Sequence, residues 1–206
     1  ITATSTNTEP TEVFRGLGVF VDSDGHVLTA DAILVPGRVY RVYTSAGIRL
    51  DAVIAAEGGL NIGLLKVTKS AHESVLPAVS FTDLSKLRLG QSVFALEGEK
   101  NISVTTGVIS SLDKKEVPIV SEKEEDVSGT ELSKTKIILD SVSVTARATG
   151  IGTPLFDLFG ELIGIRVSDT GGFVPVDAAR IADLRTLANS PKEGDTAQDQ
   201  KTSASR

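Results

Sequence analysis

Short apolar stretches alternate with turn residues along most of this chain. Runs rich in valine, isoleucine and threonine recur every 8–12 residues or so, and glycine or aspartate clusters separate them. This spacing of short β-prone segments predicts an antiparallel all-β barrel or sandwich. We expect strands at residues 13–21, 26–30, 38–44, 48–56, 62–67, 91–96, 102–109, 136–144, 162–168 and 173–176.

The segments between and after these strands add turns, a helix and a polar end. The turn at 22–25 reads DSDG and supplies a glycine where a tight hairpin needs positive φ. From residue 177 the apolar positions recur at near-helical spacing, which predicts a helix over 177–189 with Asp177 as its N-cap. Residues 113–134 are strongly charged and are most simply a solvated loop between strands.

Both ends of the chain are polar. Residues 1–11 predict a flexible lead-in. Residues 190–206 contain no aromatic or large aliphatic side chain and predict a disordered tail or linker.

Four motifs occur in a fixed order within the apolar part of the chain. Residues 16–25 read GLGVFVDSDG and lead into VLTADA at 27–32. The second motif, at 60–67, reads LNIGLLKV. The third begins with TGIGTPL at 149–155 and continues with FGELIGI, and the fourth, at 171–177, reads GGFVPVD. In this order the motifs resemble those of trypsin-like serine proteases of the HtrA branch.

The resemblance implies a fold of two antiparallel β-barrels of the trypsin type with a C-terminal helix. The resemblance covers roughly residues 13–188. It implies a double barrel over residues 12–189, with subdomains at about 12–83 and 84–189.

The resemblance of these motifs also indicates which residues occupy the positions of the catalytic triad. Ala32 stands where the family has the histidine base, Asn61 where it has the aspartate, and Ile151 where it has the serine nucleophile. Thr149 and Gly150 form the former oxyanion loop, and Thr149 replaces a glycine whose N–H would help form the oxyanion hole. A triad needs a nucleophile, a base and an anion that orients the base. We therefore expect no catalytic residue at these three positions. We expect Asn61 to be a structural remnant that forms hydrogen bonds with the neighbouring backbone.

Replacement groups for the triad are few. Asp31 is either a relocated carboxylate or, as we favour, a cap of the turn that follows. The two histidines are His26, which a four-residue rise of about 13 Å separates from residue 30, and His72. His72 with Glu73 is either a metal site or an ordinary surface pair, and we favour the second. Hydroxyl groups near the former site belong to Ser143, Thr145, Thr149 and Thr153.

Composition narrows the classes of function. The net charge of −6 and the pI near 5.0 argue against nucleic acid as a partner. The chain has no cysteine, which excludes disulfides and thiolate chemistry. No apolar run approaches the roughly 20 residues that span a bilayer, so we expect no membrane contact by this segment. We expect no cofactor and no metal.

These observations favour a pseudoprotease that acts as a protein- or peptide-binding or scaffolding module within a larger extracytoplasmic or membrane-anchored protein. The resemblance places peptide binding at the strand edge formed by Arg166, Val167, Ser168 and Asp169. Two alternatives remain open: an endopeptidase with a rearranged active site, and a purely structural domain. The family also leaves open a homo-oligomer, and implies a periplasmic or cell-surface location.

Overall fold

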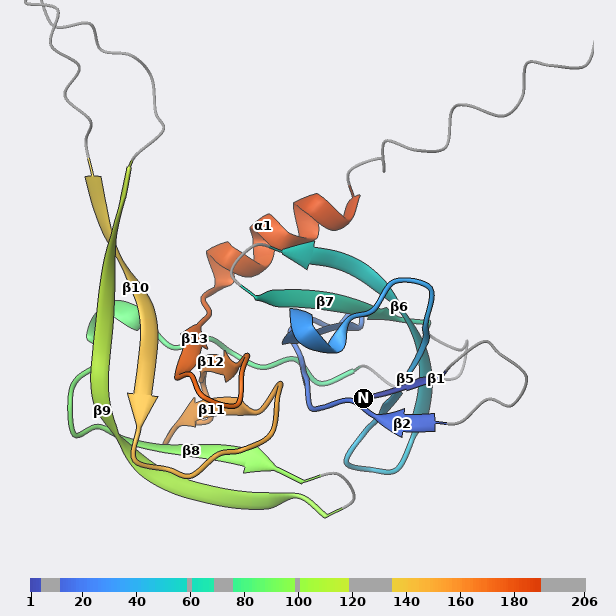
Figure 1. Cartoon of the computed structure of the whole chain (residues 1–206), viewed down its shortest axis with the longest axis horizontal. Helices are drawn as coiled ribbons and strands as arrows, with labels where there is room; N and C mark the ends of the chain where they lie inside the picture. Colours follow the sequence, from blue (N-terminus) through green and yellow to red (C-terminus); the bar gives the residue numbers. More distant parts are fainter. Residues whose placement is uncertain (5–11, 59–60, 69–75, 99–100, 119–134, 190–206) are drawn as a thin grey trace, which may run out of the picture.

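The computed structural model describes residues 1–4, 12–58, 61–68, 76–98, 101–118 and 135–189. Two antiparallel β units lie side by side, and the one α-helix among these described residues covers one side of them (Figure 1). This is the fold that the sequence predicts: two barrel-like sheets of the trypsin type followed by a C-terminal helix.

The first unit is a seven-stranded antiparallel sheet in the order β2-β1-β5-β6-β7-β4-β3. A 3₁₀ turn, η1 (Asp31–Ile33), follows β4 and leads toward β5. The strands are β1 (Thr2–Thr4), β2 (Glu12–Phe14), β3 (Val19–Phe20), β4 (His26–Ala30), β5 (Val39–Tyr43), β6 (Arg49–Gly58) and β7 (Ile62–Val67).

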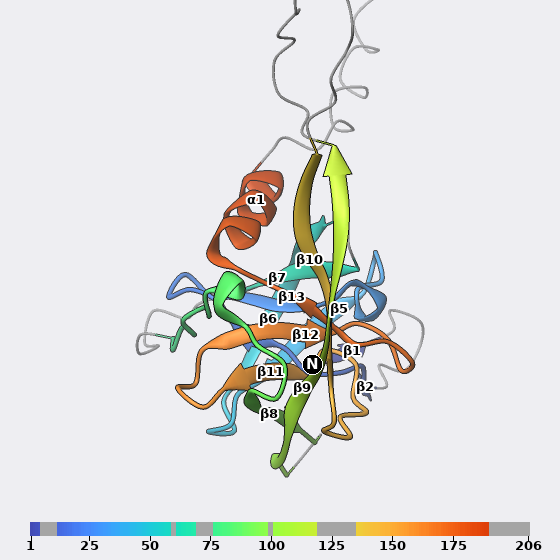
Figure 2. The same cartoon turned by 90° about the vertical axis from the view of Figure 1, so that its left-hand side faces the viewer.

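The second unit is a closed barrel in the order β10-β13-β12-β11-β8-β9. A short 3₁₀ turn, η2 (Leu84–Lys86), precedes it. In Figures 1 and 2 the paired β9 and β10 extend well beyond the other barrel strands as a two-stranded ribbon. The strands are β8 (Ser92–Glu97), β9 (Ser103–Pro118), β10 (Thr135–Val144), β11 (Pro154–Asp157), β12 (Leu162–Arg166) and β13 (Phe173–Pro175).

Three apolar clusters stabilise the molecule. One lies inside the first sheet and one inside the closed barrel. The third joins the two units, because it contains Leu28 and Leu64 from the first sheet and Leu162 from the barrel. Helix α1 (Ala178–Asn189) adds Ile181 and Leu184 to this third cluster. The helix therefore packs over the junction between the two β units.

The predicted helix at 177–189 is confirmed. Asp177 acts as its cap, because its Oδ1 accepts a hydrogen bond from the backbone N–H of Arg180 at 2.8 Å. Among the described residues, no helix is long and apolar enough to cross a membrane.

Three predictions about local structure need correction. Residues 2–4, predicted within a flexible lead-in, form β1, because Ile1 and Ala3 are buried in the first core. The single strand predicted at 13–21 is divided into β2 and β3 by the Gly16–Gly18 segment. Residues 113–118, predicted as loop, belong to β9 and pair with β10. Both faces of the β9–β10 ribbon contact solvent at residues 113–117, so this part of the strand needs no alternation of apolar and polar residues. Its many charged residues therefore suggested a loop. Residues 119–134 lie outside the described residues.

Candidate functional site

The turn that carries Ala32 follows directly from β4. Ala32 lies in η1 and is exposed to solvent. The N-cap of this turn is Ala30, which makes no side-chain capping bond, so the capping role that we favoured for Asp31 is wrong. The buried hydroxyl of Tyr40 stabilises this turn through two hydrogen bonds. It donates to the carbonyl of Ile33 and accepts the N–H of Val35.

Asn61 occupies the turn that enters β7. Its φ is 63°, and it is the one non-glycine residue with positive φ among those described. Asparagine tolerates this left-handed conformation better than most residues, which explains its presence in structural terms. Its backbone carbonyl accepts the N–H of Asp31 at 2.9 Å, so it adjoins the turn of Ala32. The predicted contact with neighbouring backbone exists, but through the Asn61 main chain.

Ile151 lies in the loop between β10 and β11. Its carbonyl accepts the N–H of Leu17 at 3.0 Å, which ties the loop to the first sheet. Its half-buried side chain packs against the core cluster of that sheet. The next residue, Gly152, has a φ of +81° and donates its N–H to the carbonyl of Arg166 at 2.8 Å.

Gly16 connects the Ala32 turn with the Ile151 loop. A Cβ on Gly16 would lie 2.5 Å from both the Ile151 carbonyl oxygen and the Cδ1 atom of Ile33. Only a glycine lets the chain pass between these two groups without displacing one of them. The structure thus brings the turn of Ala32, the turn of Asn61 and the loop of Ile151 to one junction between the two β units.

The chemistry available at this junction is limited. The three aligned positions offer a methyl group, a carboxamide and a branched alkyl group, none of which takes a proton near neutral pH. Ser143 and Thr145 lie at the end of β10 and just after it, where the hydroxyl of Thr145 accepts the N–H of Val108 at 3.0 Å. Thr153 is fully buried, and its hydroxyl has no hydrogen-bond partner among the described residues.

The loop at Thr149 and Gly150, which aligns with the oxyanion loop of the family, has a hydrogen-bond partner within the chain. The backbone N–H of Thr149 donates a hydrogen bond to the carboxylate Oε1 of Glu97, the last residue of β8. Thr149 itself has no positive φ, and Gly150 follows it in the loop. Sequence reasoning missed Glu97, because it lies 52 residues before Thr149 and belongs to none of the four motifs.

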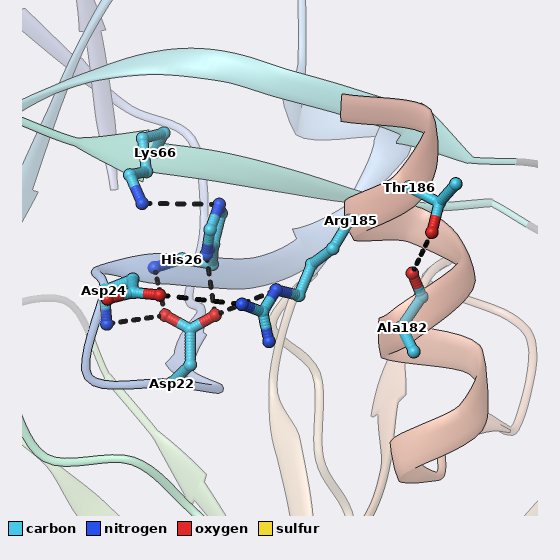
Figure 3. A network of polar contacts seen from close by, with 7 residues as sticks. All are labelled: Asp22, Asp24, His26, Lys66, Ala182, Arg185 and Thr186. Carbon is cyan, nitrogen blue, oxygen red and sulfur yellow. Dashed lines mark hydrogen bonds and ion pairs between the residues drawn. The ribbon is translucent and has the colours of Figure 1, made fainter. Parts of the chain in front are cut away.

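His26 is far from the Ala32 turn and takes part in a separate polar network (Figure 3). Its Nδ1 lies 2.6 Å from Oδ2 of Asp22, and its Nε2 lies 3.5 Å from Nζ of Lys66. Arg185 of α1 reaches the same Asp22 carboxylate at 3.4 Å and Asp24 at 3.6 Å. The network therefore ties the helix to the β3–β4 hairpin.

The pKa of Asp22 responds to these contacts. Burial by itself raises the pKa of this carboxyl, but hydrogen bonds from the backbone and ring of His26, together with the charge of Arg185, lower it below 3.8. Asp22 and His26 thus form a structural hydrogen-bonded pair at the start of β4, while Ala32 lies beyond the other end of this strand.

The predicted peptide-binding edge lies where β12 ends. Arg166 is the last residue of this strand, Val167 follows it outside the strand, and Ser168 and Asp169 form a bend. The Arg166 guanidinium donates to the carbonyl of Asp169 at 2.6 Å, and the hydroxyl of Ser168 accepts the N–H of Gly171 at 3.0 Å. Among the described residues, the N–H and C=O groups of Val167 and Ser168 have no backbone partner.

The remaining candidates concern metal binding. Residues 72 and 73, the predicted surface pair, lie outside the described residues. Within the described part of the chain, no group of three His, Asp or Glu side chains is placed to hold a metal ion.

Comparison with known proteins agrees with this architecture. The family profile of the trypsin-like peptidase domain matches residues 16–165 of the 206. A probable periplasmic serine endoprotease, DegP-like, from Bartonella henselae is 29% identical over 169 residues, which are 78% of this chain and 30% of that protein. The corresponding DegP-like protein of Brucella suis is 28% identical over 172 residues, 80% of this chain and 30% of that protein. The chain thus spans about a third of the length of the curated relatives it matches.

A solved structure supports the fold independently. The HtrA-type protease AlgW, determined with a decapeptide, superposes with a TM-score of 0.63 at 19% identity. The match covers 87% of this chain and 53% of the AlgW chain. With most of its length matched by the profile and HtrA-type proteins among its relatives, the chain belongs to the trypsin-like peptidase domain family.

Proposed function

We propose that this domain is a pseudoprotease, a family member without peptidase activity that binds an extended peptide or protein segment. One observation carries the proposal: the position of the nucleophile holds Ile151, whose side chain packs against the core of the first sheet. A residue used in this way has no reacting atom and fills space next to the former catalytic centre.

Peptide hydrolysis by a serine protease requires proton transfer from the nucleophile to a base. A serine hydroxyl attacks a peptide carbonyl only when a neighbouring base takes its proton. Ala32 cannot accept a proton, and Ile151 has none to give. His26 is held by Asp22 and Lys66 at the opposite end of β4 from η1. Loss of both base and nucleophile leaves only binding and positioning, which supports a non-catalytic role.

The end of β12 supports the binding role. Both strand neighbours of β12 stop near Arg166, where Gly152 and Phe173 are the last partners. The backbone groups of Val167 and Ser168 are left without a backbone partner among the described residues. An extended peptide can pair with such groups as an added strand, with affinity from main-chain hydrogen bonds. The decapeptide in the AlgW structure is consistent with this mode in a protein of the same fold.

The periplasmic names of the DegP-like relatives support an extracytoplasmic location for the whole protein. Since this chain matches only part of those proteins, we infer this location together with the binding role.

A labelled decapeptide library, read by fluorescence polarisation, tests the binding role. We expect a subset of peptides to bind saturably. Ser168→Pro removes one edge N–H and the side-chain hydroxyl, and should abolish binding. Ser168→Ala is the matched control, because it removes only the hydroxyl that Gly171 contacts, and it should bind as the unaltered domain does. Absence of binding to every peptide, or equal binding by both variants, contradicts the proposal.

A further inference from the structure

Glu97 is the last residue of β8 and contacts the former oxyanion loop. Val93 and Ala95 of β8 point into the barrel core, and strand alternation puts Glu97 on the same face one step further along. Ala95 pairs with Leu155 of β11, so the antiparallel register brings Glu97 level with Thr153 at the base of the loop. The strand register therefore sets the backbone position of Glu97, and its side chain reaches the loop from there.

Both oxygens of the Glu97 carboxylate are engaged. Oε1 accepts the backbone N–H of Thr149, and Oε2 accepts the hydroxyl of Thr105 at 3.3 Å. Thr105 comes from β9 and Thr149 from the loop before β11, so donors from two separate elements hold the carboxylate. Hydrogen bonds to an ionised acceptor are stronger than those between neutral groups.

Other hydrogen-bond donors on this loop and on the residues next to it have no acceptor among the described residues. The backbone N–H groups of Gly150 and Ile151 make no backbone hydrogen bond among the described residues. The buried hydroxyl of Thr153 lies 3.0 Å from where a Cβ on Gly150 would stand, and it has no partner. The Nε atom of Arg166, whose backbone N–H bonds to the carbonyl of Thr153, is also buried without a partner. Successive backbone N–H groups in a curled loop form an anion-binding nest.

We propose that the loop at residues 149–152 is a carboxylate-binding site, and that Glu97 occupies it from within the chain. The external ligand is the C-terminal carboxylate of a bound peptide, which takes the Thr149 N–H when Glu97 leaves. Glu97 is then an autoinhibitory group, because its negative charge competes for the donors and repels an incoming carboxylate. The identity of this external ligand rests on the proposed peptide-binding function, whereas the internal contact does not.

Acetate is the first probe, because it carries a carboxylate but cannot add as a strand. Nuclear magnetic resonance of ¹⁵N-labelled protein follows the amides of Thr149, Gly150 and Ile151 during an acetate titration at constant ionic strength. We expect Glu97→Ala to bind acetate about tenfold more tightly than the unaltered domain, a difference of about 1.4 kcal/mol. Glu116→Ala is the control, because it removes the same charge from an exposed position on β9 and should behave as the unaltered domain does.

A pair of peptides is the second probe. A library peptide that binds the domain is compared with the same peptide amidated at its C-terminus. In Glu97→Ala, the free carboxylate should strengthen binding about tenfold over the amide, with a smaller difference in the unaltered domain. Peptide binding with no effect of Glu97→Ala and no acetate-induced shifts overturns the carboxylate site but leaves peptide binding intact. Loop shifts with acetate but no peptide binding support the site and contradict the proposed function.

The unaltered domain provides a check that needs no variant. The amide proton of Thr149 should exchange with solvent more slowly than that of Gly150, because Thr149 donates its N–H to Glu97, whereas the Gly150 N–H has no backbone partner among the described residues. A Thr149 amide that exchanges as fast as the Gly150 amide contradicts the internal contact, even if the Glu97 variants fail to fold.

Discussion

Replacing Gly152 with alanine tests the packing of the former nucleophile loop against the first sheet. Gly152 and Gly160 share a φ of +81°, so an alanine at either position meets the same backbone strain. They differ in their surroundings. A Cβ at Gly152 would overlap the carbonyl oxygen of Leu17, which also accepts the hydroxyl of Thr29 at 2.7 Å. A Cβ at Gly160 would meet nothing within 4 Å.

Comparison of the two variants therefore separates the cost of backbone strain from the cost of the steric overlap with Leu17. A left-handed alanine costs about 1–2 kcal/mol, which is the expected loss for Gly160→Ala. Gly152→Ala adds an overpacking cost of about 1–3 kcal/mol, for a total loss of about 2–5 kcal/mol. Urea denaturation followed by circular dichroism measures both free energies of unfolding. Equal losses in the two variants would refute the contact between the loop and Leu17.

Three further changes test other parts of the account. The pKa of Asp22 is lowered in the folded state, so its stabilising contribution is present above pH 4 or so and is lost as the pH falls through the folded pKa. Urea melts at pH 7 and pH 3 should show a smaller loss of stability in Asp22→Asn than in the unaltered domain; equal losses would contradict the His26 contacts. Tyr40→Phe should destabilise the domain by about 1–3 kcal/mol, because it leaves the N–H of Val35 without its buried partner; a neutral effect in the same assay would contradict that role. Ile151→Ser should lower stability by about 1–2 kcal/mol and give no peptidase activity; measurable turnover would show that a base exists.

The sequence predicted the fold because its strongest signals are local. The DSDG turn fixes the β3–β4 hairpin, with Gly25 at a φ of 92°, and β4 has the bounds expected from its apolar run, His26–Ala30. The helix over the junction follows in the same way from its spacing and its Asp177 cap. In each case, neighbours in sequence supply the interactions that define the element.

Contacts between distant segments could not be predicted in this way. The pairing of β1 with both β2 and β5 depends on the burial of Ile1 and Ala3 in a core that other strands build. The contact of Glu97 with Thr149 depends on the register of β8 against β11, which no local pattern encodes. The candidate site was thus predictable where motifs mark it, at Ala32, Asn61 and Ile151, and not where the barrel brings in a residue from another strand.

Incubation of the purified domain with casein and with a serine-directed phosphonate probe, over a broad pH range, measures whether the domain has peptidase activity. Active trypsin serves as the positive control. We expect no cleavage and no labelled protein at any pH. Hydrolysis that disappears on replacing one residue of this chain, such as Thr153→Ala, would contradict the account and establish a rearranged active site.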